Sequence, residues 1–262
     1  MEIIGYLSSI FIGVVLGLLG GGGSILSIPI LVYLFNIEPV LASAYSLFIV
    51  GTTSFVGAIP KYRQHLVNIR TGLLFGIPSI ITIFCTRKWI VPSIPQIIFE
   101  FEYITITKRI LLLGIFAVLM VLAAIPMIRG KQEMASRNRR FRFLLVMMEG
   151  VIIGFLTGLV GAGGGFLIIP ALVFLTGLKF KTAVGTSLFI ISTNSLLGFL
   201  GDVMNYSMDW PFLLKITGLA VFGILIGHYL TRYFTGIKLR KTFGWFTLAM
   251  GCYILAKELL RF

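Results

Sequence analysis

The chain has 262 residues, of which 58% are hydrophobic and only 12% are charged, and its mean hydropathy is +1.03. Soluble proteins carry roughly 25% charged residues, so this chain has too few charges to cover a soluble surface. The composition excludes a soluble enzyme and a disordered chain, and it indicates a protein embedded in lipid. The net charge of +13 indicates contact with anionic lipid headgroups rather than with nucleic acid, because the Lys and Arg residues lie in short runs between apolar stretches.

Apolar stretches follow one another along the whole chain. Crossing the hydrocarbon layer takes roughly 20 helical residues, so the stretches at 24–36 and 165–177 are too short to cross comfortably alone. Lipid offers the backbone no hydrogen bonds, so the spans must be helices, and we expect an all-α polytopic membrane protein with about 8–10 membrane helices. The stretches lie near 3–19, 24–36, 40–60, 71–92, 110–128, 143–160, 165–177, 182–200, 211–231 and 242–260.

An internal repeat divides the chain. The sequence GLLGGGGSILSIPILVYL from Gly17 aligns with GLVGAGGGFLIIPALVFL from Gly158, at an offset of 141 residues. The segment 17–60 aligns without a gap on 158–201, and 19 of these 44 positions are identical. We predict a first membrane repeat at 1–128, a basic linker at 129–142 and a second membrane repeat at 143–262, an organisation typical of transporters.

Loop charges predict the orientation of each copy. The loop 61–70 carries three Lys or Arg residues and no acid, whereas its counterpart 201–210 carries two aspartates and no base. The positive-inside rule places such loops on opposite sides of the membrane, so the copies are predicted to be inverted. The linker 129–142 is then cytoplasmic and both termini lie outside. The segment 87–109 fits this topology least well, because it must lie outside despite its four bases.

Inverted copies need an odd number of crossings each. Either all five apolar stretches of a copy cross, or the first two form a re-entrant hairpin and three cross. A glycine run separates these first two stretches in both copies, at 20–23 and at 161–165, where Ala162 interrupts the second run. Glycine allows the helix to break and the backbone to approach a ligand, and restarting helices would present anion-binding N–H groups. The alternative is close helix packing, which we assign to the glycine pairs 13/17, 72/76, 154/158 and 223/227.

Polar side chains after each break form a second signal. Helical periodicity places Ser46, Thr53 and Gly57 on one face, and the repeat places Ser187, Asn194 and Gly198 on the matching face. Such donors suit a small oxyanion, although interhelical hydrogen bonds would explain them too. The candidate substrate-binding residues are Gly20, Gly21, Gly22, Gly23, Ser24, Ser46, Thr52, Thr53, Gly161, Gly163, Gly164, Gly165, Ser187, Thr193 and Asn194.

These motifs resemble a known family. The pair GGGGSILSIPIL and GAGGGFLIIPAL, each followed by a segment of ASAYSLF or AVGTSLF type, resembles the sulfite exporter TauE/SafE-like permeases of the toluenesulfonate uptake permease superfamily. The resemblance covers essentially the whole chain and implies transport of small sulfur-containing anions such as sulfite, sulfonates or thiosulfate. The Lys and Arg residues crowded into 87–109 depart from the shorter connection that the resemblance implies.

We therefore expect a cell-membrane permease that moves a small anion by alternating access. A passive anion channel, an intramembrane enzyme and a structural component of a membrane complex are the alternatives. No enzyme motif is found, and we expect no metal and no cofactor. Glu149 and His228 are candidates for proton coupling. No obvious Arg or Lys lies at the middle of a span, so backbone N–H groups and hydroxyls are expected to hold the anion.

Overall fold

The structure is a computed structural model that describes residues 2–21, 23–101, 104–129, 139–233 and 236–259. Its helices are α1 (Glu2–Leu19), α2 (Gly23–Tyr33), α3 (Pro39–Arg63), α4 (Ile69–Cys85), α5 (Val91–Ser93), α6 (Lys108–Arg129), α7 (Arg139–Val160), α8 (Gly165–Thr176), α9 (Phe180–Val203), α10 (Trp210–Leu230) and α11 (Gly236–Leu259). A π-helical turn, Thr86–Ile90, joins α4 to α5, and a 3-10 turn, Thr231–Tyr233, follows α10.

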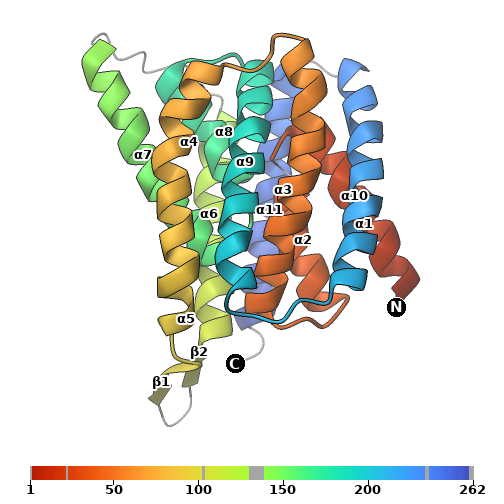
Figure 1. The fold of residues 1–262 in the computed structure, drawn as a ribbon, viewed down its shortest axis with the longest axis vertical. Coiled ribbons are helices and arrows are strands. Elements are labelled where there is room, and N and C mark those ends of the chain that lie inside the picture. The colour runs from red at the N-terminus through yellow and green to blue at the C-terminus, as the bar shows by residue number, and fades with distance from the viewer. Residues whose placement is uncertain (1, 22, 102–103, 130–138, 234–235, 260–262) are drawn as a thin grey trace.

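The all-α polytopic fold is confirmed. In the described part of the chain, six helical segments are long and apolar enough to cross a membrane, and three shorter apolar helices accompany them. The bundle carries one feature that the sequence did not predict. Strands β1 (Ile97–Phe101) and β2 (Ile104–Thr107) form an antiparallel hairpin, which projects beyond one end of the bundle (Figure 1).

The helix boundaries follow the repeat. Shifted by 141 residues, α1, α2, α3 and α4 fall on α7, α8, α9 and α10 to within a few residues at most ends. The packing follows it too, because α1 packs on α10 as α7 packs on α4, and α3 packs on its own counterpart α9. In Figure 1, α3 rises from the lower end of the bundle while α9 descends from the upper end. The inverted orientation of the copies in a membrane stays a prediction.

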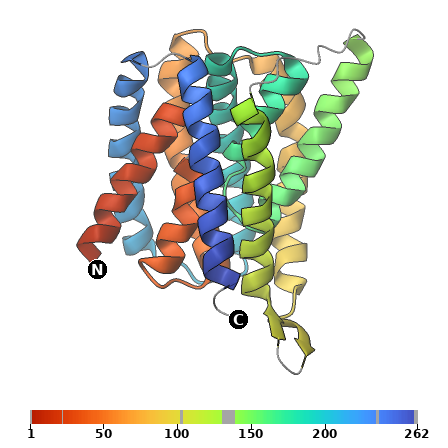
Figure 2. The ribbon, with the colours of Figure 1, turned by 180° about the vertical axis from the view of Figure 1, so that it is seen from behind.

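The first two helices of each copy form a hairpin. The ring centroids of Tyr6, near the start of α1, and Phe35, just after α2, are 5.9 Å apart. In the second copy, Phe143 near the start of α7 lines a cavity together with Thr176 at the end of α8. In each copy the start of the first helix and the end of the second therefore lie at the same end of the bundle. Helices α2 and α8 have only 11 and 12 residues, too few to cross the hydrocarbon layer, and the two breaks between the helices meet each other, which favours the hairpin alternative over five crossings. Figure 2 shows α1 from the other side.

The ionisable residues separate between the two ends. Lys61, Lys181 and His228 line one cavity at the end where the 64–68 connection lies. Asp202 lies at the opposite end beside Arg87. The segment 87–109, which fitted the topology poorly, carries fewer loop charges than its sequence suggests. Arg87 and Lys108 are buried in the bundle rather than exposed in a loop, because each finds a polar partner there.

Helix packing explains most of the paired glycines outside the breaks. A Cβ on Gly13 or Gly17 would collide with the backbone of α10, and one on Gly154 with the backbone of α4. A Cβ on Gly223 or Gly227 would likewise collide with the backbone of α1. The assignment is wrong for Gly76, which has open space where a Cβ would be.

The predicted orientation can be tested by labelling. In a background with Cys85 and Cys252 replaced by serine, single cysteines at the exposed Gln64 and Ser207 should react with an impermeant thiol reagent from opposite sides of the membrane. We expect labelling of Ser207→Cys in intact cells, and of Gln64→Cys only after permeabilisation. Labelling of both positions from the same side would contradict inverted copies.

Candidate functional site

The two glycine breaks cross each other inside the bundle. A Cβ on Gly21 would lie 2.5 Å from the carbonyl carbon of Gly165, and a Cβ on Gly165 would lie 2.5 Å from Cα of Gly21. Real Cβ atoms do not approach backbone atoms this closely, so the two backbone segments can touch only because both residues are glycine. Gly23 and Ser24 are buried next to this crossing. Gly22 lies outside the described residues.

The two breaks begin with the same backbone conformation. Gly20 and its counterpart Gly161 have φ values of +72° and +81°, and each N–H donates to the helix before it, Gly20 to Leu16 and Gly161 to Thr157, at 2.7 Å. The left-handed residue ends the first helix as a glycine C-cap does. Helices α2 and α8 then restart, and the N-cap of α8, Gly164, offers no side-chain acceptor. The first N–H groups of such a helix lack intrahelical partners and carry partial positive charge.

Arg87 lies against the second break. Its guanidinium touches the position that a Cβ on Gly161 would occupy, and the side chain is fully buried. Nη1 donates to Ser43 Oγ at 2.8 Å and lies 3.3 Å from Asp202 Oδ2, in an ion pair that is also fully buried. Nε and Nη2 have no hydrogen-bond partner. A buried cation therefore lies at the first residue of the second break, where α7 ends, with two N–H-bearing atoms unused.

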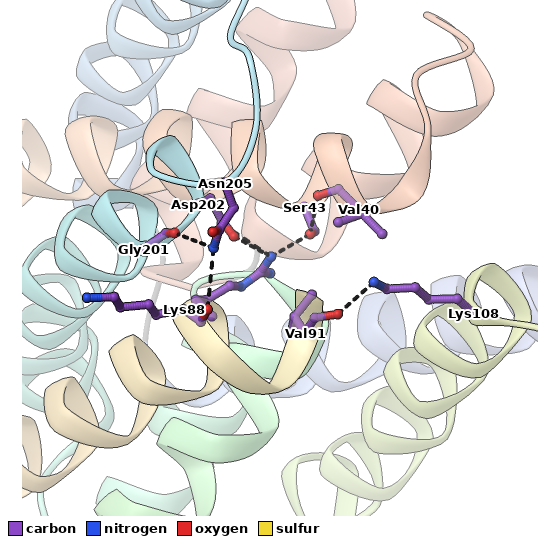
Figure 3. Close-up of polar contacts among 9 residues, drawn as sticks. Val40, Ser43, Lys88, Val91, Lys108, Gly201, Asp202 and Asn205 are labelled. Atoms are coloured by element: carbon purple, nitrogen blue, oxygen red, sulfur yellow. Dashed lines mark hydrogen bonds and ion pairs between the residues drawn. The ribbon is translucent and has the colours of Figure 1, made fainter. Parts of the chain in front are cut away.

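Local structure fixes this placement. Arg87 belongs to the π-helical turn after α4, and π-bulges change which side of a helix a side chain faces. The turn is held from two sides (Figure 3). Asn205 Nδ2 reaches the carbonyl oxygens of Gly201 and Lys88, at 3.0 and 3.4 Å, and Lys108 Nζ donates to the carbonyl of Val91 at 2.6 Å. The labelled Asp202 and Ser43 lie on the same side of this turn in Figure 3, where both contact the Arg87 guanidinium.

The sequence shows no obvious Arg or Lys at the middle of a span and predicts that backbone N–H groups and hydroxyls hold the anion, whereas the structure adds Arg87, buried beside the second break. Sequence reasoning placed Arg87 in an external connection and Asp202 in an external acidic loop, because both lie at the ends of apolar stretches. In the structure Arg87 lies in the π-helical turn after α4, and α9 continues to Val203, three residues beyond the predicted stretch. The side chains of Arg87 and Asp202 are both fully buried. One signal was present in the sequence, since the repeat aligns Arg87 with His228, another ionisable residue at a helix end.

The predicted serines lie in the core near the first break. Ser46 Oγ and Ser27 Oγ are 2.5 Å apart, which joins α3 to α2. Ser24 Oγ donates to the carbonyl of Gly21 at 2.6 Å, within the break itself. Ser187, the counterpart of Ser46, is buried but donates to Val184 in its own helix. Within the first copy, Ser27 therefore links Ser46 to the break, because its hydroxyl also lies 2.9 Å from the carbonyl oxygen of Ser24.

The other predicted polar residues are largely used within the bundle. Thr53 donates to Ile49 and Thr193 to Phe189 and Ile190, each within its own helix. Asn194 Nδ2 donates to Ser79 Oγ on α4 at 2.6 Å, which is the interhelical bond considered as the alternative, although its Oδ1 has no partner. Thr52 is half-buried on α3.

The structure points to neighbouring residues that the sequence reasoning passed over. Ser54 and its counterpart Ser195 are fully buried, and neither hydroxyl has a hydrogen-bond partner. A Cβ on Gly163 would lie 2.8 Å from Ser195 Oγ, so this hydroxyl faces the second break. Thr157 Oγ1 is also unpartnered and lies against Gly164. Buried polar groups are normally bonded, so unused hydroxyls and guanidinium nitrogens around one break indicate a polar ligand there.

The family follows from comparison with known proteins. The family model for "Sulfite exporter TauE/SafE" matches residues 6–254 of this chain. The chain belongs to this family.

Relatives in the family carry transporter names. The chain is 29% identical over 251 residues to a "Probable membrane transporter protein" of Xylella fastidiosa (strain 9a5c), covering 93% of this chain and 91% of that one. It is 27% identical to the "Probable membrane transporter protein YunE" of Bacillus subtilis (strain 168), covering 84% and 85%. No solved structure matches significantly. The family and these names agree with a multi-pass membrane transporter.

Proposed function

We propose that this protein carries a small sulfur-containing oxyanion, of the sulfite, sulfonate or thiosulfate type, across the cell membrane by alternating access between two inverted repeats. The observation that carries the proposal is the second glycine break, which has a buried guanidinium with unused N–H groups beside its first residue, Gly161, and a helix start without a side-chain cap at Gly164. The family description names sulfite, and the chemistry of the break suits an anion of that kind.

Charge balance supports this choice of substrate. An anion that leaves water needs its charge balanced and its oxygens bonded, because a bare charge in a low-dielectric interior is too costly. Arg87 is already neutralised by Asp202, so it offers directed donors at little net charge. Two helix starts at the crossing, each worth about +0.5 charge, could balance roughly one negative charge. A site built this way can release the anion again.

The proposed binding set joins backbone and side chains from both copies. The breaks supply N–H groups near Gly23 and Gly165, and Arg87 supplies Nε and Nη2. The hydroxyls of Ser195 and Thr157 add donors at the second break. The sequence-derived candidates Ser46, Thr53, Ser187 and Asn194 remain part of the proposal as residues that position these donors.

The function can be tested by flux in proteoliposomes. Labelled sulfite should enter with saturable kinetics, and unlabelled sulfite preloaded inside should accelerate that entry by counterflow. Flux that rises linearly over the full concentration range without counterflow would indicate a passive channel. Absence of flux for sulfite, sulfonates and thiosulfate alike would contradict the proposal.

Matched serine variants should locate the site within the same assay. Ser195→Ala removes an unpartnered buried hydroxyl, so we expect unchanged stability and an affinity for sulfite weaker by about 0.5–1.5 kcal/mol, the net value of one hydrogen bond. Ser192→Ala is the control, since Ser192 donates within α9 to Phe189. Equal affinities of the two variants would remove Ser195 from the site.

A further inference from the structure

The repeat pairs ionisable residues at opposite ends of the bundle. The offset of 141 residues aligns Lys61 with Asp202 and Arg87 with His228. Lys61 and Asp202 lie in the last turns of α3 and α9, whereas Arg87 lies just after α4 and His228 in the last turn of α10. At one end of the molecule these positions hold Arg87 and Asp202, in a buried ion pair. At the other end the same positions hold Lys61 and His228, a pair with no acid.

The basic end encloses a cavity, which we call the Lys61 cavity. Its volume is about 90 Å³, and its walls are Lys61, Gln64, Leu66, Lys181, His228 and Thr231. One water needs about 10–15 Å³ of such space, so there is room for a small oxyanion. Gln64 Nε2 lies 3.3 Å from His228 Nε2 at the exposed side of this cavity.

The charge at this cavity is unbalanced. The side chain of Lys61 is almost fully buried, with 3% of the residue exposed. No carboxylate of the described residues lies within ion-pairing distance of it, and none lines the cavity. Lys181 brings a second ammonium group to the same walls. A buried ammonium group without a counter-ion is unfavourable, so this end lacks the negative charge that Asp202 supplies at the other.

We propose that the Lys61 cavity is an anion-binding site, and that its bound oxyanion takes the place of the missing carboxylate. Lys61 and Lys181 provide the charge, and the side chains of Gln64 and His228 add hydrogen-bonding groups. The Thr231 hydroxyl already donates to the carbonyls of Gly17 and Gly227 and only lines the wall. The basic end then closes only when a small oxyanion such as sulfite or sulfate lies between Lys61 and His228, whereas the opposite end closes through Arg87 and Asp202 without a ligand. The binding site stands on the cavity itself, and its role in closing this end rests on the proposed transport function.

The first test is anion protection of a cysteine. In the background lacking Cys85 and Cys252, purified Gln64→Cys protein in nanodiscs would be labelled with a thiol reagent at rising concentrations of sulfate and of sulfite. We expect protection that saturates, with a midpoint at least tenfold higher in Lys61→Met. The control is Arg63→Met, which removes an exposed charge two residues away that does not line the cavity. Protection that is absent, or equal in Lys61→Met and Arg63→Met, would overturn the proposal.

A charge transplant gives the second test. The double variant Lys61→Asp with His228→Arg copies the Arg87–Asp202 pair to the basic end. We expect Gln64→Cys to be protected without any anion in this variant, and flux to be lost while the protein stays monodisperse. Full labelling without anion, together with wild-type flux, would overturn the proposal.

The two tests separate this proposal from the proposed function. Saturable protection that depends on Lys61 in a protein with no flux would support the site and contradict the transport function. Saturable flux with no Lys61-dependent protection would support the transport function and contradict the site.

Discussion

Replacement of Arg87 by methionine should abolish anion flux and strongly destabilise the protein. The substitution leaves Asp202 buried without its partner, and breaking a buried pair from one side costs about 3–5 kcal/mol. It also removes the two unused guanidinium nitrogens at the second break. We expect a lower unfolding temperature and a flux reduced by about 100-fold or more, since each 1.4 kcal/mol is tenfold in binding.

A double variant distinguishes the structural role of Arg87 from its role in binding. Arg87→Met combined with Asp202→Leu removes both charges, and apolar replacement of a buried pair is often neutral or stabilising. This variant should recover most of the unfolding temperature without recovering flux. Lys88→Met, at the next position, should leave both unchanged. Recovery of flux in the double variant would show that Arg87 serves only to neutralise Asp202.

The second large effect is expected at Gly161. Substitution by alanine places a Cβ against Arg87 Nη2 and Ser43 Cβ, in a backbone conformation with φ of +81°. The left-handed conformation alone costs a residue with a Cβ about 1–2 kcal/mol, and the collision displaces the guanidinium from the break. We expect Gly161→Ala to lose flux and several degrees of unfolding temperature, measured in the same liposome and melting assays.

Gly218→Ala is the matched control for this effect. Gly218 lies within α10 and has open space at its Cβ position, so alanine there should be neutral or stabilise the helix by up to about 1 kcal/mol. Ala162 shows that one position of the break already accepts a methyl group. If Gly161→Ala transported and melted like Gly218→Ala, the break would have no role in holding the site together.

The Arg87 pair and the Lys61 cavity together describe how the two ends differ. The Arg87–Asp202 pair is closed and fully buried, whereas Gln64 and Lys181 leave the Lys61 cavity open to one side. The described residues of both breaks are buried, so the proposed alternating-access cycle requires the bundle to open before an anion reaches them. The loop charges predict that the basic end is cytoplasmic.

The sequence alone determined much of the architecture of this protein. Composition gave the membrane environment, and the repeat gave matched helix boundaries, because apolar length and glycine breaks are properties of contiguous residues. Gly20 and Gly161 were found in this way, since an interrupted apolar helix is visible without knowledge of its neighbours. The faces of α3 and α9 were also identified, because helical periodicity places Ser46 and Ser187 on definite sides.

Tertiary structure decided which groups meet at the site. Arg87 and Asp202 are 115 residues apart and belong to different copies, so no local pattern could pair them, and each looked like a loop charge at the end of an apolar stretch. Asn194 turned out to be bonded to Ser79, whereas the adjacent Ser195 was left unpartnered beside Gly163. Periodicity predicts the face on which a side chain lies, but its hydrogen-bond partner depends on which helix packs there. Tertiary structure likewise brings the start of α1 and the end of α2 together, through Tyr6 and Phe35, and makes the two breaks meet at Gly21 and Gly165, because both contacts join residues far apart in the sequence.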